Sequence, residues 1–165
     1  MAESARCIRV VSAVVERQGR YLITQRSDSG ILPGQWEFPT GQVVPGESDE
    51  AALQRELRER LGVEVLVGRL RARRTHFYVG YSLERVLYDA QILPHQTPSP
   101  LRVADLRWVA AQDLGSYPFP PADQATMDSI LGLAQDDGNR TSGTGRTGAF
   151  AQAQERLTKT NRLYR

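Results

Sequence analysis

The sequence predicts an α+β fold in which a mixed β-sheet is accompanied by two helices. Alternating apolar residues predict strands, whereas apolar residues at helical spacing and a proline-led helix start predict helices. The expected strands are residues 8–16, 20–26, 36–38, 63–73, 75–90 and 105–109, and the expected helices are residues 48–61 and 121–134. With 165 residues, the chain is long enough to form one well-buried core.

The first two strands are expected to pair as a hairpin, because Gln18-Gly19 between them suits a two-residue turn. Cys7 lies at the head of the first strand and is the only cysteine, which excludes an internal disulfide bond. We expect its thiol to be packed within the fold rather than to act as a nucleophile.

The helix predicted for residues 48–61 carries two acidic residues on one flank. Ser48 is a suitable N-cap, and an apolar stripe recurs every fourth residue at Leu53, Leu57 and Leu61. Glu56 and Glu59 are three residues apart and share a flank beside this stripe. Neighbouring carboxylates on a core-packed helix suit a hard divalent cation such as magnesium, which bridges to phosphates. The pattern therefore suggests chemistry on a diphosphate.

The segment from Gly41 to Val63 resembles the box of the Nudix hydrolases. That box reads Gly, five residues, Glu, seven residues, Arg-Glu-aliphatic, one residue, Glu-Glu, one residue, Gly-aliphatic. The positions in register are Gly41, Glu47, Arg55, Glu56, Leu57, Glu59, Gly62 and Val63. So many fixed positions at fixed spacing make a specific signal. The resemblance implies an α/β/α sandwich over residues 7–134 and a hydrolase of nucleoside diphosphate-linked compounds.

The resemblance also implies a role for each matching residue and a metal cofactor, Mg²⁺ or alternatively Mn²⁺. Glu56 would be the catalytic base or a metal ligand, and Glu59 would bind the metal. Arg55 would orient these carboxylates, and Glu47 would brace the loop or assist the metal. The backbone carbonyl near Gly41 would be a further metal ligand.

Two arginines depart from the family pattern. Arg60 replaces the second glutamate of the Glu-Glu pair, and Arg102 stands six residues before Trp108, where similar proteins carry another metal-binding glutamate. Arg60 lies four residues after Glu56 and can pair with it. Two interpretations of Arg60 stay open: it weakens metal binding severely, or it is a solvated helix residue and Glu47, Glu56 and Glu59 suffice for the metal.

Segments outside the box resemble the MutT-like nucleoside triphosphate pyrophosphohydrolases. They are Trp36-Glu37-Phe38-Pro39, Arg26 at a strand end, and Tyr117-Pro-Phe-Pro-Pro-Ala-Asp123. The resemblance implies that Arg26, Phe38 and Asp123 hold a nucleoside triphosphate. Asp123 stands where an asparagine reads the base, and an ionised carboxylate accepts hydrogen bonds only, so base edges with amino or imino donors are favoured. A similar Pro-Ala-Asp occurs in relatives that act on cytidine triphosphates, and this resemblance implies pyrimidine or modified-base substrates. The alternatives are a surface arginine at Arg26 and a helix-start charge at Asp123.

The loop before the box is expected to be distorted at Thr40, which replaces the first glycine of the usual Gly-Gly pair. The added Cβ enters a loop where the family brings a backbone carbonyl close to the metal.

We expect residues 1–135 to form the Nudix domain and residues 136–165 to form a flexible basic tail. The tail holds six Arg or Lys against three acids and begins with a Gly-, Ser- and Thr-rich linker. Residues 149–165 can form a short helix that docks on a protein partner or a second subunit, and the alternative is a solvated tail.

No partner other than a nucleotide is indicated by the remaining patterns. The arginines at 69, 71, 73 and 74 follow an alternating strand pattern without interleaved aromatic residues, which argues against a nucleic-acid platform. No signal core and no apolar run of membrane-spanning length is present, so we expect no membrane association and a cytoplasmic location. The rival to a hydrolase is a catalytically impaired Nudix domain that serves as a nucleotide sensor or an assembly module.

Overall fold

The structure is a computed structural model that describes residues 6–29 and 32–130. Seven strands make up the sheet: β1 (Arg6–Arg17), β2 (Arg20–Gln25), β3 (Trp36–Glu37), β4 (Thr40–Gln42), β5 (Val65–Tyr78), β6 (Tyr81–Ile92) and β7 (Asp105–Ala110). The helical elements are α1 (Asp49–Leu61), the 3₁₀ turns η1 (Ala111–Ser116) and η2 (Pro121–Asp123), and α2 (Gln124–Ile130).

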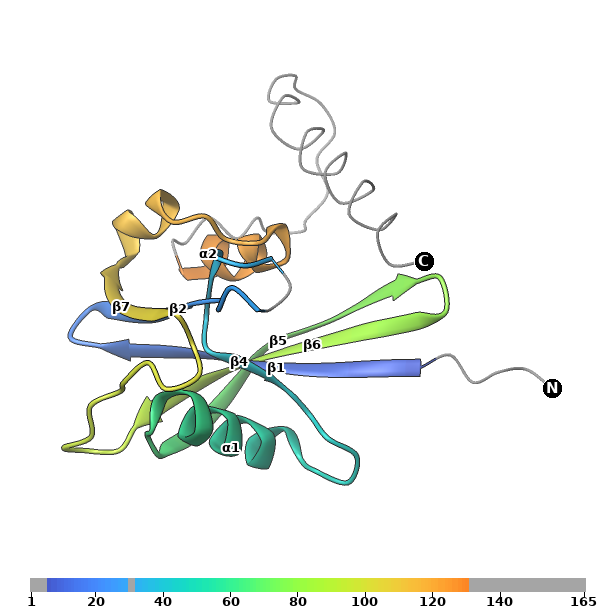
Figure 1. The fold of residues 1–165 in the computed structure, drawn as a ribbon, viewed down its shortest axis with the longest axis horizontal. Coiled ribbons are helices and arrows are strands. Elements are labelled where there is room, and N and C mark those ends of the chain that lie inside the picture. The colour runs from blue at the N-terminus through green and yellow to red at the C-terminus, as the bar shows by residue number, and fades with distance from the viewer. Residues whose placement is uncertain (1–5, 30–31, 131–165) are drawn as a thin grey trace, which may run out of the picture.

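The sheet is mixed, as predicted, because β1 pairs with β6 in parallel and all other pairings are antiparallel. The strand order is β3-β2-β1-β6-β5, with β4 paired to β1 and β7 paired to β2. Figure 1 shows α1 on one face of the sheet and α2 on the opposite side. This arrangement is the predicted α/β/α sandwich.

Two apolar clusters hold the layers together. The first lies between α1 and strands β1, β5 and β6, and it includes the stripe residues Leu53, Leu57 and Leu61. The second lies among β2, β3, β7, η1 and α2, and it includes Ile23 and Met127. Each cluster fixes one helical layer against the sheet, because removing apolar surface from water is the main favourable term in folding.

The ends of α1 are fixed by local chemistry that the sequence indicates. The Ser48 hydroxyl accepts a hydrogen bond from the Ala51 amide at 3.1 Å, which satisfies one of the free donors of the first turn. Gly62 ends the helix in the left-handed region with φ 69°. The first hairpin also matches its prediction, since Gln18 and Gly19 both have positive φ, as a type I′ turn requires.

Some element boundaries differ from the predictions. The break expected at residue 74 is wrong, because Arg73, Arg74 and Thr75 pair with β6 and the chain turns only at Val79-Gly80. The strand β4 was not predicted, since three residues are too short for an alternating pattern, and the 3₁₀ turn η1 was not predicted either. The last helix begins with a 3₁₀ turn. Its predicted end, 131–134, lies outside the described residues.

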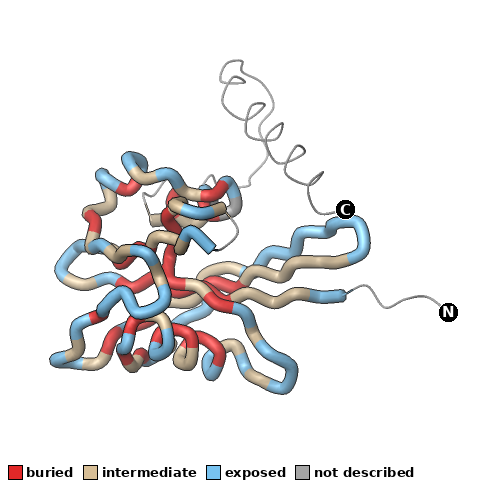
Figure 2. Tube along the Cα trace, viewed as in Figure 1, coloured by how far each residue is buried: buried red, intermediate tan, exposed pale blue. Residues whose placement is uncertain are grey.

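The remaining observations on the fold concern Cys7, the hairpin tip, the predicted tail and membrane-spanning helices. Cys7 is exposed, so the prediction of a packed thiol is wrong. Figure 2 shows that the tip of the β5–β6 hairpin is exposed, and Phe77 and Val79 lie there. The predicted tail, 136–165, and its docking helix lie outside the described residues. Within the described chain, no helix is both long enough and apolar enough to span a membrane.

Candidate active site

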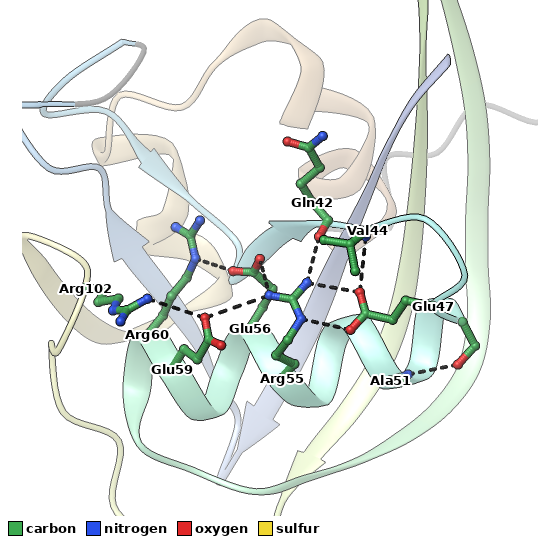
Figure 3. Close-up of polar contacts among 10 residues, drawn as sticks. Gln42, Val44, Glu47, Ala51, Arg55, Glu56, Glu59, Arg60 and Arg102 are labelled. Atoms are coloured by element: carbon green, nitrogen blue, oxygen red, sulfur yellow. Dashed lines mark hydrogen bonds and ion pairs between the residues drawn. The ribbon is translucent and has the colours of Figure 1, made fainter. Parts of the chain in front are cut away.

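Arg55 on α1 connects the two acidic residues nearest to it in the predicted site (Figure 3). Its Nε and Nη2 donate to both carboxylate oxygens of Glu47 at 2.8 and 3.0 Å. Its Nη1 donates to Glu56 Oε1 at 3.0 Å, and its Nη2 also donates to the backbone carbonyl of Gln42 at 2.9 Å. Hydrogen bonding to Arg55 lowers the pKa of Glu47, and bonding to Glu47 raises the pKa of Arg55.

Gly41 on β4 lies directly against the side chain of Glu56. A Cβ added to Gly41 would lie 2.1 Å from Glu56 Cγ and 2.6 Å from Glu56 Oε2, so no residue with a side chain fits there without moving Glu56. Glu56 is only 8% exposed. Arg55 and Gly41 therefore hold the Glu56 carboxylate from two sides, which fixes its position at the junction of α1 and β4.

The two unexpected arginines bind the two acidic residues of the helix flank. Arg60 Nε donates to Glu56 Oε2 at 2.6 Å, which confirms the predicted pairing. Arg102 Nη1 donates to Glu59 Oε2 at 3.5 Å. The Arg102 amide also donates to the Arg60 carbonyl at 3.1 Å, and this bond places the residue beside the end of α1.

The acidic residues do not form a metal site as they are arranged. Both oxygens of Glu56 accept from arginines, and Glu59 contacts Arg102 and Arg55. Among the described residues, no group of three or more His, Cys, Asp or Glu side chains is positioned to hold a metal ion. A fixed positive charge about 4 Å from a cation costs on the order of 4 kcal/mol per unit charge at an effective dielectric of ~20. The donor set therefore disfavours a divalent ion here.

A cavity of about 550 Å³ opens beside Glu56. The predicted residues that line it are Arg26, Gly41, Glu56 and Glu59, together with Arg60 and Arg102. Glu37 lines it too, and Arg26 Nε donates to Glu37 Oε2 at 2.7 Å. Burial raises the pKa of Glu37, while Arg26 acts in the opposite direction. Arg55 does not line the cavity, but it donates to Glu56 and to the Gln42 carbonyl, which belong to lining residues, and Glu47 is connected to the cavity through Arg55.

Asp123 is buried and turned toward the sheet rather than toward the helix start. Its Oδ1 accepts from Arg85 Nη2 of β6 at 2.7 Å, and its Oδ2 has no hydrogen-bond partner among the described residues. Burial raises the pKa of Asp123, and the nearby Arg85 and Arg26 oppose that rise. Asp123 does not line the cavity, but it lies close enough to Arg26 and Glu37 to interact with both.

Phe38 lies in the core beside the site. Its side chain is 2% exposed and packs on Phe119 with ring centroids 5.4 Å apart. In this conformation it offers no open face to a nucleotide, so its predicted substrate contact stays a prediction.

The distortion expected at Thr40 is not present. Its hydroxyl donates to the Val11 carbonyl at 2.9 Å and pairs with the Ser12 hydroxyl at 2.8 Å. The strand stays in regular register with β1, because these two bonds accommodate the added side chain.

Three groups of the site were not singled out from the sequence. In the expected strand 36–38, alternation places Glu37 on the face opposite Trp36 and Phe38, which gives no signal in the sequence that its carboxylate is buried. The Gln42 carbonyl carries no sequence signal, because every residue has one. Arg85 is 38 positions from Asp123, and only the fold brings the two together.

Comparison with known proteins gives consistent matches. The NUDIX domain family matches residues 10–129. The chain is 36% identical over 129 residues to the CTP pyrophosphohydrolase of Escherichia coli K12, covering 76% of this chain and 93% of that protein. It is 29% identical over 136 residues to the nucleoside triphosphatase NudI of Escherichia fergusonii, covering 75% and 96%. The solution structure of the E. coli ORF135 protein has a TM-score of 0.68 at 32% identity, covering 83% and 97%.

Proposed function

The chain belongs to the Nudix hydrolase family, and from this premise we propose that it hydrolyses nucleoside triphosphates to nucleoside monophosphates and pyrophosphate. Relatives named as a CTP pyrophosphohydrolase and a nucleoside triphosphatase cover most of its length. They support this class of reaction for the present chain. The modified or pyrimidine base favoured by the sequence is part of the same proposal.

The observation that carries the proposal is the position of the Glu56 carboxylate. It lies on the wall of the cavity, held by Arg55 and packed against Gly41. Arg55 is itself fixed by the bidentate bond to Glu47. A carboxylate held this firmly beside a cavity is pre-oriented for a reaction, and such pre-orientation lowers the entropic part of a barrier.

The proposed reaction moves one proton and breaks one bond. A water oxygen attacks a phosphorus of the anhydride, the bridging P–O bond breaks, and pyrophosphate leaves with the bond's electron pair. Glu56 takes the proton of the water. Its two oxygens accept one hydrogen bond each from arginines, and a carboxylate has about four lone-pair sites, so it retains acceptor capacity for that water.

The nucleotide would be held by Arg26, which lines the cavity, and by Asp123 and Phe38, which do not line it. Arg26 lines it and would contact the phosphates, because a guanidinium forms paired hydrogen bonds with phosphate oxygens. Asp123 would accept hydrogen bonds from an amino or imino group of the base through Oδ2, which is buried without a described partner. Phe38 would support the base from the core side.

Proteins of this family generally use a divalent metal ion. For this chain we propose that turnover requires Mg²⁺, which Mn²⁺ can replace. Glu59 and the carbonyl near Gly41 would be its ligands, and Glu56 would serve either as a further ligand or, as above, as the base. Because Arg60 and Arg102 are bonded to the two glutamates, we expect a high metal concentration to be needed.

The test is pyrophosphate release from a panel of canonical and modified nucleoside triphosphates, with Mg²⁺ or Mn²⁺. We expect metal-dependent turnover that is lost in Glu56→Gln, a variant of equal size without the charge. If Glu56→Gln and the wild type release pyrophosphate at equal rates, the proposed role of the Glu56 carboxylate is contradicted.

A second function is favoured by the ion pairs of Arg60 with Glu56 and of Arg102 with Glu59. These pairs neutralise the carboxylates that a metal would need, which suits a nucleotide sensor or an assembly module with impaired catalysis. Silence across the whole panel together with measurable nucleotide binding would select this function over hydrolysis.

A further inference from the structure

The charged side chains that line the cavity are three arginines and three glutamates. Arg26 pairs with Glu37 at 2.7 Å, Arg60 pairs with Glu56 at 2.6 Å, and Arg102 pairs with Glu59 at 3.5 Å. All six side chains line the same cavity of about 550 Å³. A site that relies on a divalent ion needs a surplus of carboxylate charge, and this cavity has none.

Arg60 retains hydrogen-bonding capacity beyond its ion pair. A guanidinium has five N–H donors, and Arg60 uses only its Nε toward Glu56 among the bonds found in the described residues. Its charge also reaches Glu37 across the cavity, where it acts to lower the pKa of that acid. The remaining donors of Arg60 therefore suit an anion that enters the cavity.

Arg102 is exposed and makes only a long bond to Glu59, so its guanidinium is accessible to a ligand. Its side chain is 70% exposed, and its bond to Glu59 is long at 3.5 Å. Exposed ion pairs of this kind contribute little to stability, so exchanging Glu59 for a phosphate costs little. The backbone bond from Arg102 to the Arg60 carbonyl keeps the two arginines adjacent throughout.

We propose that Arg60 and Arg102, together with Arg26, form a polyphosphate-binding subsite that holds the phosphates of a nucleotide without a divalent cation. The inference rests on the proposed function in one respect, that the cavity receives a nucleotide. A planar guanidinium binds two phosphate oxygens in parallel and thereby supplies the positive charge that a metal ion otherwise brings.

The test is calorimetric binding of α,β-methylene-CTP, which is not cleaved at that linkage, and of inorganic tripolyphosphate to the full chain. Each is titrated in EDTA and in Mg²⁺. We expect the wild-type Kd for both ligands to differ by less than about threefold between the two conditions. We expect Arg60→Gln and Arg102→Gln each to weaken binding in EDTA about tenfold, because each removes a charge-assisted bond to phosphate.

Arg58→Gln is the matched control. Arg58 lies on the same helix, is 58% exposed and pairs with Glu64 away from the cavity, so this variant should bind as the wild type does. Thermal unfolding checks that each variant is folded. If Arg60→Gln is unfolded, Arg102→Gln decides, since its side chain is largely exposed.

Two results would overturn the subsite. One is wild-type binding that weakens more than about threefold in EDTA, and the other is wild-type affinity in EDTA of either glutamine variant that is folded. The turnover assay separates this inference from the proposed function. Hydrolysis combined with metal-dependent binding overturns the subsite alone, whereas metal-free binding without hydrolysis supports the subsite and overturns the hydrolase.

Discussion

Gly41 and Glu56 are packed so closely that a methyl group on Gly41 would overlap the Glu56 side chain, with Cβ 2.1 Å from Cγ. The contact joins β4 to α1 at the wall of the cavity. The glycine is therefore required here for space, since its φ is not among the positive values of the chain.

Gly41→Ala is expected to lower turnover by about 100-fold, because displacement of Glu56 by an ångström or more misaligns the group that meets the water. Gly115→Ala is the matched control, since a Cβ at Gly115 would meet nothing within 4 Å. The measurement is the rate of pyrophosphate release by both variants. Equal rates in the two variants would show that the position of Glu56 is unimportant.

Arg60→Glu is expected to raise Mg²⁺-dependent turnover by at least about tenfold, because it replaces a repelling charge near the metal by an attracting one. The same variant loses the bond to Glu56, so its melting temperature without metal should fall and Mg²⁺ should restore it. Arg58→Gln should show neither effect. If turnover does not rise at any Mg²⁺ concentration, Arg60 is not what limits the metal.

Asp49→Asn is expected to destabilise the fold by about 2 kcal/mol at neutral pH, because Asp49 accepts charge-assisted bonds. Its Oδ2 accepts from Arg9 at 2.6 Å and from the Tyr88 hydroxyl at 2.8 Å. Glu50→Gln, which changes the exposed neighbour on the same helical turn, is the control. The free energy of unfolding in urea measures both.

The effect of Asp49→Asn should also depend on pH. Burial acts to raise the pKa of Asp49, but the bonds from Arg9 and Tyr88 outweigh it and leave that pKa lowered. The stabilisation is therefore present above the unfolded pKa of about 3.9 and is lost as the pH falls through the folded value. The difference in unfolding free energy between wild type and variant should shrink below about pH 4. A difference that stays constant would contradict this linkage.

Asp123→Asn is expected to change the pH dependence of stability in the opposite sense. Burial raises the pKa of Asp123, so the folded protein binds this proton more tightly than the unfolded chain does. The contribution of the Asp123 carboxyl to the free energy of unfolding therefore falls as the pH rises from about 3.9 toward the raised pKa. Over this pH window, the unfolding free energy of Asp123→Asn in urea should therefore rise relative to that of the wild type. Asp113→Asn, at an exposed site, should show no such rise. If the unfolding free energy of Asp123→Asn instead falls relative to that of the wild type over this window, the raised pKa assigned to Asp123 is wrong.

The features of the site that lie within the single helix α1 could be predicted from the sequence. The Ser48 cap, the leucine stripe and the Arg60–Glu56 pair all follow from spacing along α1, and the structure confirms each. The strand β4 was not predictable, because its three residues carry no pattern. It forms because β1 offers it a partner from Val10 to Ser12.

The sequence by itself determined the family, through the fixed spacing of the box, and the local helical chemistry, because on a regular helix Glu59 lies one turn after Arg55 and Glu56. Only the tertiary structure decided that Glu59 and Asp123 are paired with arginines distant in the sequence. Arg102 reaches Glu59, and Arg85 reaches Asp123, across 43 and 38 positions. Such contacts depend on how sheet and helices pack, and the strength of each charge depends on the burial that this packing creates.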